Sequence, residues 1–455
     1  MATRRTSIHG QWSSRWAFIL AATGSAVGLG NIWRFPYVTA ENGGAAFIVL
    51  YLLCILFVGV PIMMSEIMLG RRGRQSPINT MTSLAAEEGQ SKNWRILGIA
   101  GVLGGFFILT FYSIVGGWTL AYVFRAVSGI FTVSDAEEIG TIFNDLVSDP
   151  ERLLAWHTIF MVMVVFVVSR GVKSGLEKAV RYLMPALFVM LLIMCGYALS
   201  TEGFADAMAY MLQPDFSNIN HETVLIALGQ AFFSLSLGMG AIMTYGSYLP
   251  KRVAIHRTTF TVAAMDTTVA LLAGVAIFPI MFSYGLTPEE GGPGLIFKTL
   301  PIAFGQMPYG TLFGSIFFVL LLFAAWTSAL SLLEPAVAWM VEKKRFTRMR
   351  ATLYAGAVAW FLGLGSLLSL NLWSGMTFGG MTFFELVEFL SVNILLPLGG
   401  MFIAIFAAWA VSRKSSFDEF NMSELAYKCW QITVRYVAPI AVLLIFLEET
   451  IGIFE

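Results

Sequence analysis

Three glycines and two polar side chains interrupt the first long apolar stretch of the chain. The segment GSAVGLGNIWRFP (residues 24–36) contains Gly24, Gly28 and Gly30 beside Asn31 and Arg34. Each glycine weakens a helix relative to alanine, and a charged side chain is costly at membrane depth. A break in such a helix would expose carbonyl oxygens at one half-helix end and amide hydrogens at the other. These groups could bind a small cation and a carboxylate, respectively.

A second glycine-interrupted stretch, GQAFFSLSLGMGAIMTYGSY (229–248), lies near the middle of the chain. Gly238 and Gly240 repeat the spacing of Gly28 and Gly30 in the first stretch. Ser234 and Ser236 lie among the apolar residues of the second stretch. Paired breaks in corresponding halves of a chain predict a midplane site in an inverted-repeat transporter. The side chains that could supply oxygen atoms there are Asn31, Ser234, Asp266, Thr327 and Ser328. Each alone would more often make a helix-packing hydrogen bond, so the prediction depends on their coincidence with the breaks.

The composition is that of an integral membrane protein. The 455 residues are 57% hydrophobic and only 12% charged, with a mean hydropathy of +0.75, whereas about 25% of the residues in a soluble domain are charged. Apolar runs of roughly 17–25 residues can cross a bilayer as helices, so we predict an all-α polytopic membrane protein. The eleven predicted spans are at about 14–38, 45–69, 96–124, 154–169, 179–200, 223–248, 260–285, 311–341, 350–370, 383–411 and 429–454.

The basic residues are concentrated in alternate loops between these spans. Lys and Arg gather at 4–5, 71–95, 170–181, 251–257, 343–350 and 413–414, whereas the intervening loops are acidic or neutral. Because cytoplasmic loops are enriched in Lys and Arg, the N-terminus is predicted to be cytoplasmic. An odd number of spans then predicts an extracellular C-terminus, in a multi-pass protein of the cell membrane.

Several function classes are disfavoured by what the sequence lacks. It contains no Walker A, H-E-x-x-H or nucleophile-elbow motif, so neither ATP hydrolysis nor enzymatic catalysis is predicted. A formal net charge of zero and the absence of a basic tail do not favour nucleic acid as a partner. The loops are short except 128–153, 201–222 and 286–310, which predicts a single transmembrane domain over residues 1–455.

The motifs around the two breaks resemble those of a known family. GSAVGLGNIWRFPY is followed by ENGGAAF (41–47) and GVPIMMSEIMLGR (59–71), and GQAFFSLSLGMG and FAAWTSALSLLEP (323–335) extend the similarity. Together they resemble the neurotransmitter:sodium symporter family, in its bacterial amino-acid branch, over essentially the whole chain. The resemblance implies a LeuT-type five-plus-five inverted repeat with helices 1 and 6 broken. The repeats would cover about 12–200 and 223–412, with an additional helix at about 429–454.

The resemblance implies two sodium sites between the broken helices. The first would be formed by Ala26, Asn31, Ser234 and Asp266, and the carboxylate of the substrate would complete it. The second would be formed by Gly24, Val27, Ala324, Thr327 and Ser328. The members that lack a polar side chain would contribute backbone carbonyl oxygens.

One central substrate pocket is implied in the same way. The substrate carboxylate would meet amides near Gly28 and Gly30 and the hydroxyl of Tyr112, and its ammonium would face Phe233 and Ser236. Nothing in the implied pocket offers a charge to a substrate side chain, so hydrophobic L-amino acids, aliphatic and aromatic, are the predicted substrates. The full set is Ala26, Gly28, Gly30, Ile108, Tyr112, Phe233, Ser234, Ser236, Met239, Ser328, Ala329 and Leu332.

Further residues match parts of the family that move or support the breaks. Arg34 and Glu388 resemble the oppositely charged outer gate. Gly175 and Pro185 lie ten residues apart in the fifth span and are the predicted release hinge, with an ordinary proline kink as the alternative. Glu66, in the second span, is predicted to accept hydrogen bonds from amides freed by the break in span six.

The inner gate departs from the family pattern. Trp12 matches that pattern, but His9 occupies the position where the family usually has arginine. Glu342 is the predicted acidic partner, with Arg4 or Arg5 substituting for the missing arginine.

The function predicted from these residues is sodium-coupled import of hydrophobic L-amino acids by alternating access, with two sodium ions and no chloride requirement. Many animal members need chloride, and the resemblance places its ligands at Tyr51, Gln230, Ser234 and the seventh span. Asp266 stands in that span where the family usually has asparagine, and its carboxylate would replace the charge of chloride. The open alternatives are proton coupling through Asp266 or Glu66, and an amino-acid-gated channel or receptor on the same fold.

Overall fold

The computed structural model describes the chain except residues 1–4, 135, 218, 287–292, 345 and 452–455. The described residues form helices joined by turns, and an isolated β-bridge pairs Phe378 with Met381. The prediction of an all-α protein is therefore confirmed for this part of the chain.

Among the described residues, eight helical segments are long and apolar enough to cross a membrane. They are Ala45–Gly73, Lys92–Val127, Pro150–Ser169, Val172–Ala198, Ile255–Ser283, Gly310–Lys343, Arg348–Leu368 and Phe383–Ala410. A ninth candidate is the pair Arg15–Ala26 and Gly30–Glu41, whose halves meet at a bend of 55°.

The predicted eleven spans are not all found as helices of that length. The predicted sixth span is divided into α12 (His221–Ser234) and α13 (Ala241–Ser247), and each is shorter than a membrane crossing requires. The predicted eleventh span contains α22 (Ala438–Ile451), and its last residues lie outside the described part of the chain. The count of eleven and the five-plus-five repeat therefore stay predictions.

Some spans are single α-helices, and others contain a π-helical turn. The single helices are α6 (Arg95–Val127), α9 (Pro150–Ser169), α14 (Ile255–Ser283), α16 (Gly310–Lys344) and α17 (Arg348–Leu368). The first two composite spans are α1 (Arg15–Ala26) with η1 (Gly30–Arg34) and α2 (Phe35–Glu41), and α3 (Ala45–Cys54) with η2 (Ile55–Gly59) and α4 (Val60–Gly73). The third is η4 (Val172–Glu177) with α10 (Lys178–Ala198). The last two are α18 (Phe383–Glu388) with η6 (Phe389–Leu395), α19 (Leu396–Ile405) and η7 (Phe406–Ala410), and α21 (Glu424–Ile432) with η8 (Thr433–Val437) and α22.

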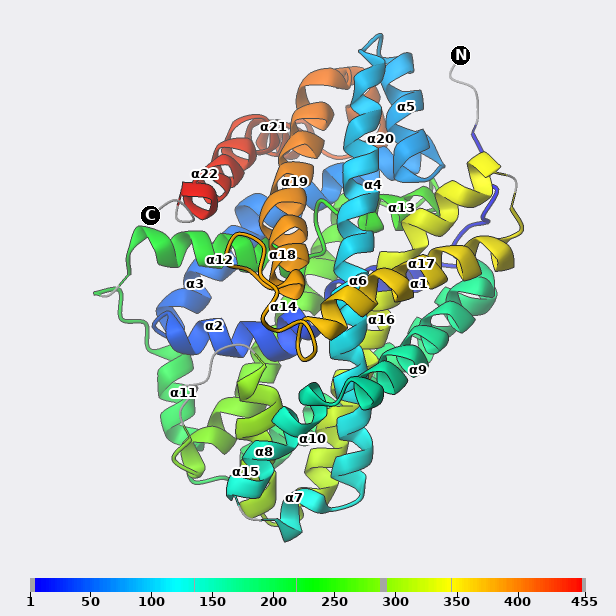
Figure 1. Cartoon of the computed structure of the whole chain (residues 1–455). Helices are drawn as coiled ribbons and strands as arrows, with labels where there is room; N and C mark the ends of the chain where they lie inside the picture. Colours follow the sequence, from blue (N-terminus) through cyan, green and yellow to red (C-terminus); the bar gives the residue numbers. More distant parts are fainter. Residues whose placement is uncertain (1–4, 135, 218, 287–292, 345, 452–455) are drawn as a thin grey trace.

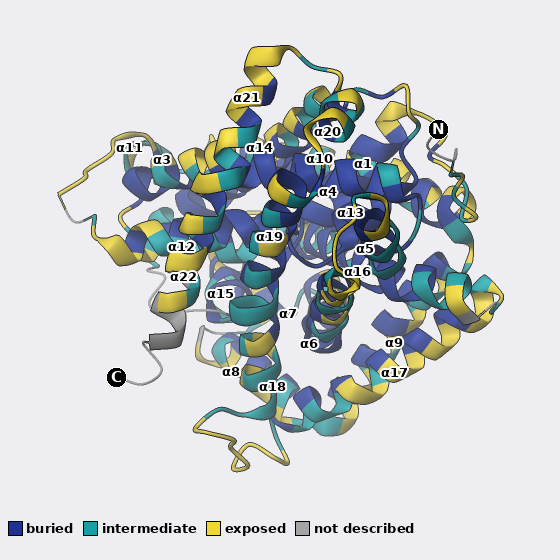
Figure 2. Cartoon of the chain, turned by 90° about the horizontal axis from the view of Figure 1, so that it is seen from above, coloured by how far each residue is buried: buried dark blue, intermediate teal, exposed yellow. Residues whose placement is uncertain are grey.

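The helices form a bundle with its most buried elements at the centre. Helices α6 and α16 pack against each other through the middle of the molecule, while α9 and α17 lie side by side on one flank (Figure 1). Figure 2 shows buried residues gathered around α1, α4 and α16 and exposed residues on the outward faces of α9 and α17. Many of those outward residues are large and apolar, such as Val162, Phe166 and Phe361. An apolar outer surface is suited to contact with lipid.

Shorter helices lie at the two ends of the bundle. Those from the acidic or neutral long loops gather at one end (Figure 1): α7 (Ile130–Val133), α8 (Ala136–Ser148), α11 (Phe204–Leu212), and η5 (Leu295–Thr299) with α15 (Leu300–Gln306). The opposite end holds α5 (Pro77–Glu87), η3 (Lys92–Trp94) and α20 (Arg413–Phe420), which come from basic loops. The sorting of charge along the sequence thus corresponds to two ends of the molecule.

Local backbone conformation accounts for both central breaks. Helix α1 ends at Ala26 because Val27 has extended dihedral angles (φ −67°, ψ 108°). Between α12 and α13, Ser236, Gly238 and Gly240 have positive φ values of 54°, 81° and 72°. Glycine adopts this left-handed region without steric cost, so Gly238 and Gly240 allow the chain to turn between the two half-helices.

Candidate functional site

The two broken helices face each other at the centre of the bundle. The hydroxyl of Ser236, in the α12–α13 linker, donates to the carbonyl oxygen of Ser25 near the end of α1 at 2.8 Å. On the other side of the contact, a Cβ atom at Gly30 would lie 2.8 Å from the ring of Phe233. Only glycine allows the backbone and this aromatic ring to approach so closely.

Three predicted ligands of the first sodium site meet in one buried cluster. The Asn31 amide nitrogen donates to Asp266 Oδ1 at 2.8 Å and to Ser234 Oγ at 3.1 Å. Ser234 Oγ in turn donates to Asp266 Oδ2 at 2.6 Å. The three side chains, from η1, α12 and α14, are fully buried. The fourth predicted ligand, Ala26, is the last residue of α1. Amide, hydroxyl, carboxylate and carbonyl oxygens are hard ligands suited to a small cation.

The predicted second sodium set lies where α1 packs on α16. Ser328 Oγ is 3.2 Å from the carbonyl oxygen of Val27 and 3.5 Å from that of Gly24. Thr327 donates to the carbonyl of Ala324 at 3.1 Å, and its Cβ would be 3.3 Å from a Cβ placed on Gly24. The structure thus brings together all five predicted residues, and their oxygen atoms are all uncharged.

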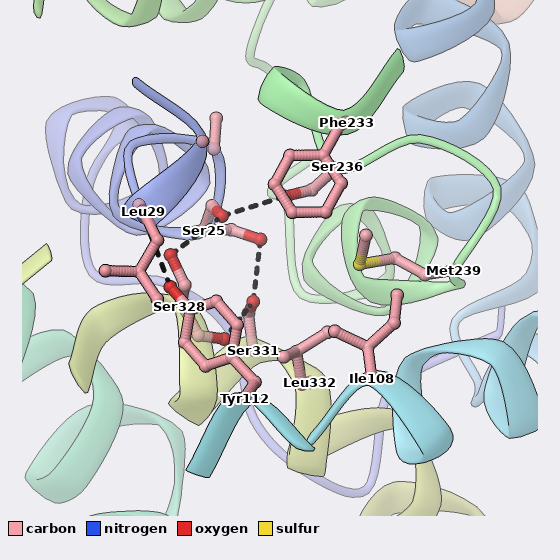
Figure 3. A pocket seen from close by; sticks show the side chains of 13 residues that line it. Ser25, Leu29, Ile108, Tyr112, Phe233, Ser236, Met239, Ser328, Ser331 and Leu332 are labelled. Atoms are coloured by element: carbon pink, nitrogen blue, oxygen red, sulfur yellow. Dashed lines mark hydrogen bonds between the residues drawn. The ribbon is translucent and has the colours of Figure 1, made fainter. Parts of the chain in front are cut away.

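A small cavity adjoins both sets. It measures about 30 Å³ and is enclosed by side chains from α1, α6, α16 and the α12–α13 region (Figure 3). Ten of the twelve predicted substrate residues line it: Ala26, Gly28, Gly30, Ile108, Tyr112, Phe233, Ser236, Met239, Ser328 and Leu332. The other two do not, because Ser234 faces Asp266 and Tyr51 instead and Ala329 is buried away from the cavity.

Three lining residues were not predicted from the sequence: Ser25, Leu29 and Ser331. Ser25 Oγ donates to Ser331 Oγ at 2.8 Å, so the two serines close the cavity together. Ser331 follows Ser328 by three residues on α16, a spacing that puts both on one helix face. This spacing is the feature of the sequence from which Ser331 could have been predicted as a lining residue.

The cavity has a polar side and an apolar side. The hydroxyl oxygen of Tyr112 accepts a hydrogen bond from the amide of Leu29 at 3.4 Å, and a Cβ at Gly28 would lie 3.0 Å from the same oxygen. In Figure 3 the side chains of Ile108, Met239 and Leu332 form the opposite side. A ligand with one polar end and one apolar end would match this division.

The predicted outer gate borders a second cavity. Arg34 and Glu388 line this space of about 370 Å³ together with Phe233. The Arg34 guanidinium carbon lies 5.2 Å from the centre of the Phe233 ring, a cation–π distance. Because Phe233 lines both cavities, its ring separates the central one from the gate residues.

Glu342 has a partner other than Arg5, one of the two arginines predicted for it. Glu342 does not pair with Arg5, because Arg5 forms an ion pair with Glu87 at 2.7 Å, and Arg4 lies outside the described residues. Instead, Glu342 Oε1 is 3.0 Å from Nε2 of His9. Histidine therefore contacts the acid directly from the position where arginine was expected.

Trp12 fixes the same N-terminal segment to α13. Its indole nitrogen donates to the carbonyl oxygen of Tyr245 at 3.0 Å. Its backbone amide donates to the carbonyl oxygen of Tyr248 at 3.1 Å. Only 2% of the Trp12 surface is exposed. The segment before α1 thus covers the end of α13, the second half of the broken α12–α13 pair.

Glu66 contacts the break in the way predicted. Its Oε1 atom accepts a hydrogen bond from the amide of Gly238 at 2.7 Å.

The two residues of the predicted hinge lie in different kinds of helix. Gly175 lies in the π-helical turn η4, whereas α10 continues through Pro185 without unwinding. The neighbouring Met184 would lie 3.1 Å from a Cβ at Gly24, so this part of α10 packs against the predicted second sodium site.

A buried ion pair near the basic end of the bundle was not predicted. Glu334 pairs with both terminal nitrogens of Arg348 and accepts a hydrogen bond from Tyr248 at 2.7 Å. Among the described residues, no group of three or more His, Cys, Asp or Glu side chains could hold a metal ion.

Sequence and structure comparisons identify the family. The model of the sodium:neurotransmitter symporter family matches residues 9–135 and 136–454. The chain belongs to this family. It is 36% identical to an uncharacterized sodium-dependent transporter of Bacillus subtilis (strain 168), over 98% of each chain. It is also 27% identical to the creatine transporter of Torpedo marmorata, over 92% of this chain and 75% of the relative.

A solved structure shows the same fold. The crystal structure of MhsT in complex with L-phenylalanine is 41% identical in sequence and superposes with a TM-score of 0.89. The match covers 97% of this chain and 99% of MhsT. The chain is therefore a multi-pass membrane transporter of the symporter family that resembles MhsT, and a transport role is supported in place of an enzymatic one.

Proposed function

We propose that this symporter imports hydrophobic L-amino acids, aliphatic and aromatic, together with two sodium ions. The observation that carries the proposal is the division of the central cavity between the helix breaks and the apolar group Ile108, Met239 and Leu332. None of its described lining residues is charged, so a charged substrate side chain would be buried without a partner. The complex of MhsT with L-phenylalanine supports the same substrate class.

The polar half of the cavity would hold the amino-acid backbone. The substrate carboxylate would meet the amides that follow the end of α1 and the Tyr112 hydroxyl. Its ammonium would face carbonyl oxygens near Ser25 and Phe233. A carboxylate in this position would lie next to the cluster of Asn31 and Asp266, which would couple substrate binding to the first sodium ion.

The side chains must rearrange to admit a substrate. A space of about 30 Å³ is far below the volume of ligand pockets, roughly 300–1,000 Å³. Met239 has three rotatable bonds and a polarizable sulfur, so it can repack around side chains of different shape. Movement of Phe233 would open the central cavity toward Arg34 and the outer gate.

We also infer independence from chloride and an N-terminus in the cytoplasm. Asp266 receives hydrogen bonds from Asn31 and Ser234, so its carboxylate would supply the negative charge that chloride supplies in many animal members. The basic end of the bundle would face the cytoplasm of the cell. The C-terminus would then be extracellular if the chain crosses the membrane eleven times.

Uptake into proteoliposomes tests the proposed function. Purified protein should accumulate hydrophobic amino acids above their external concentration when sodium is higher outside. Replacing external sodium with choline should abolish this accumulation, and a sodium ionophore serves as the control. Undiminished uptake in choline would support proton coupling instead, and equilibration without accumulation would support an amino-acid-gated channel. A panel of the twenty amino acids would define the substrate range.

A further inference from the structure

An apolar groove lies between α6 and α19, away from the central site. It has a volume of about 350 Å³, within the range of ligand pockets, roughly 300–1,000 Å³. Leu97 and Ala100 of α6 form one wall, and Leu398 and Phe402 of α19 form the other. The Phe402 side chain at its edge is 41% exposed on the outer surface of the bundle, so the groove opens toward the surroundings of the helices.

Close helix packing at its floor preforms the groove. A Cβ at Gly104 would lie 3.3 Å from the Cβ of Leu395, so α6 approaches this span closely. A Cβ at Gly399 would lie only 2.5 Å from the carbonyl oxygen of Gly238. These contacts fix α19 against both α6 and the α12–α13 linker, so the groove does not depend on a mobile loop.

The polar end of the groove is basic. Ser91 and Asn93 line this end, and Trp94 and Ile96 line the groove next to them. The exposed Lys92 lies between Ser91 and Asn93 in sequence, and the exposed Arg95 lies between Trp94 and Ile96. Trp94 lines the groove between these two cations and packs edge-on against Phe406, with 4.9 Å between ring centres. Tryptophan is enriched at the level of lipid headgroups.

The acidic residues in the preceding loop are already occupied by other groups. Glu87 pairs with Arg5 at 2.7 Å, and Glu88 pairs with Arg72 at 2.9 Å and accepts the amide of Ser412 at 3.0 Å. Within the described part of the chain, no ion pair joins Lys92 or Arg95 to an acid. Two exposed cations are therefore available in the segment that lines the polar end of the groove.

We propose that this groove binds an anionic phospholipid. One acyl chain lies between α6 and α19, and Lys92 and Arg95 hold the phosphate of the headgroup. An apolar groove that is open to the bilayer and has a basic rim at its end is suited to a lipid with an anionic headgroup. A soluble anion would use the cations without the groove, and a zwitterionic lipid would use the groove with less benefit from the cations.

Native mass spectrometry of the full chain in detergent tests the proposal. The probes are phosphatidylglycerol and phosphatidylcholine with identical acyl chains. The wild type should retain one phosphatidylglycerol at concentrations where phosphatidylcholine is lost. Because each cation near an anionic lipid surface contributes about a fivefold change in affinity, Lys92→Gln with Arg95→Gln should weaken phosphatidylglycerol binding roughly 30-fold. The matched control, Lys173→Gln with Lys178→Gln, removes two exposed cations elsewhere and should leave binding unchanged.

A second variant tests the apolar part of the site. Ala100→Trp should fill the groove and reduce retention of both lipids, whereas the charge variant affects mainly phosphatidylglycerol. If Ala100→Trp lowers the midpoint of thermal unfolding, Phe402→Asp at the exposed edge replaces it and should repel the anionic lipid. Equal binding of the two lipids by the wild type would overturn the proposal, as would equal retention of phosphatidylglycerol by the wild type and the Lys92/Arg95 variant.

Discussion

Nε2 of His9 lies 3.0 Å from Oε1 of Glu342, and this contact joins the N-terminal segment to the end of α16. The same carboxylate accepts hydrogen bonds from the amide of Ser76 at 2.8 Å and from the side chain of Asn79 at 2.6 Å. Glu342 therefore connects three segments at the basic end of the bundle. Trp12 holds the same N-terminal segment against α13, so the contact closes the central site from the basic end of the bundle.

Replacing Glu342 with glutamine should loosen this closure. Hydrogen bonds to a charged group contribute about 1.5–3 kcal/mol, so the open population should rise by about tenfold or more. A cysteine at the buried position Ser247, in a chain with its three native cysteines replaced by serine, should then react faster with a thiol reagent. Glu222→Gln, an exposed substitution in α12, is the control. An unchanged labelling rate in Glu342→Gln would show that His9 and Glu342 do not hold the segment closed.

Asn31→Ala should strongly weaken sodium-dependent substrate binding. The side chain contacts Ser234 and Asp266, so its loss removes a proposed sodium ligand and disturbs the other two. We expect the sodium concentration at half-saturation to rise about tenfold or more, with reduced cooperativity between sodium and substrate. Equilibrium binding of labelled amino acid across a sodium titration measures both. Asn42→Ala, at the end of α2, is the matched control, and wild-type sodium dependence in Asn31→Ala would contradict the assignment.

The sequence predicted the position of the site better than its limits. The glycine breaks pointed to Asn31 and Ser234, whose side chains meet in the structure, because positive φ and close backbone contact require particular residues. Ser25 and Ser331 were missed because a serine inside a membrane helix usually bonds to its own backbone. Arg5, one of the two predicted partners of Glu342, reaches Glu87 instead, because pairing between distant segments depends on tertiary distance. The break between α12 and α13 also explains why the sixth apolar run is not one long helix in the structure.

Met239→Phe should narrow the range of substrates. Met239 lines the apolar side of the cavity, and a rigid ring there cannot repack as methionine does. Overpacking costs about 1–3 kcal/mol, so phenylalanine and tryptophan should lose between about fivefold and a hundredfold in affinity, whereas alanine and valine lose less. Competition against one labelled substrate measures the series. Equal losses at every substrate size would mean that Met239 does not contact the substrate side chain.

Pro185→Ala should slow transport more than it weakens binding. Proline removes a backbone donor inside α10 and favours local opening of the helix. The adjacent Met184 packs against Gly24, so opening here would admit water to the proposed second sodium site. We expect a several-fold lower rate of uptake with near-normal substrate affinity. The alternative is an ordinary kink, and an unaltered uptake rate in Pro185→Ala would favour it.

Uptake by the wild type should not change when chloride is replaced by gluconate. The carboxylate of Asp266 would lie beside the first sodium ion, and at ~4 Å their attraction is about 4 kcal/mol for an effective dielectric constant near 20. Asp266→Asn keeps the shape of the side chain and removes this charge, so the variant should need chloride or lose activity. The Tyr51 hydroxyl, which donates to Ser234 at 3.1 Å, would be one donor to the incoming anion. Uptake by Asp266→Asn in a chloride titration measures the requirement, with Asp206→Asn in α11 as the control. Chloride dependence in the wild type, or full chloride-free activity in Asp266→Asn, would contradict this role.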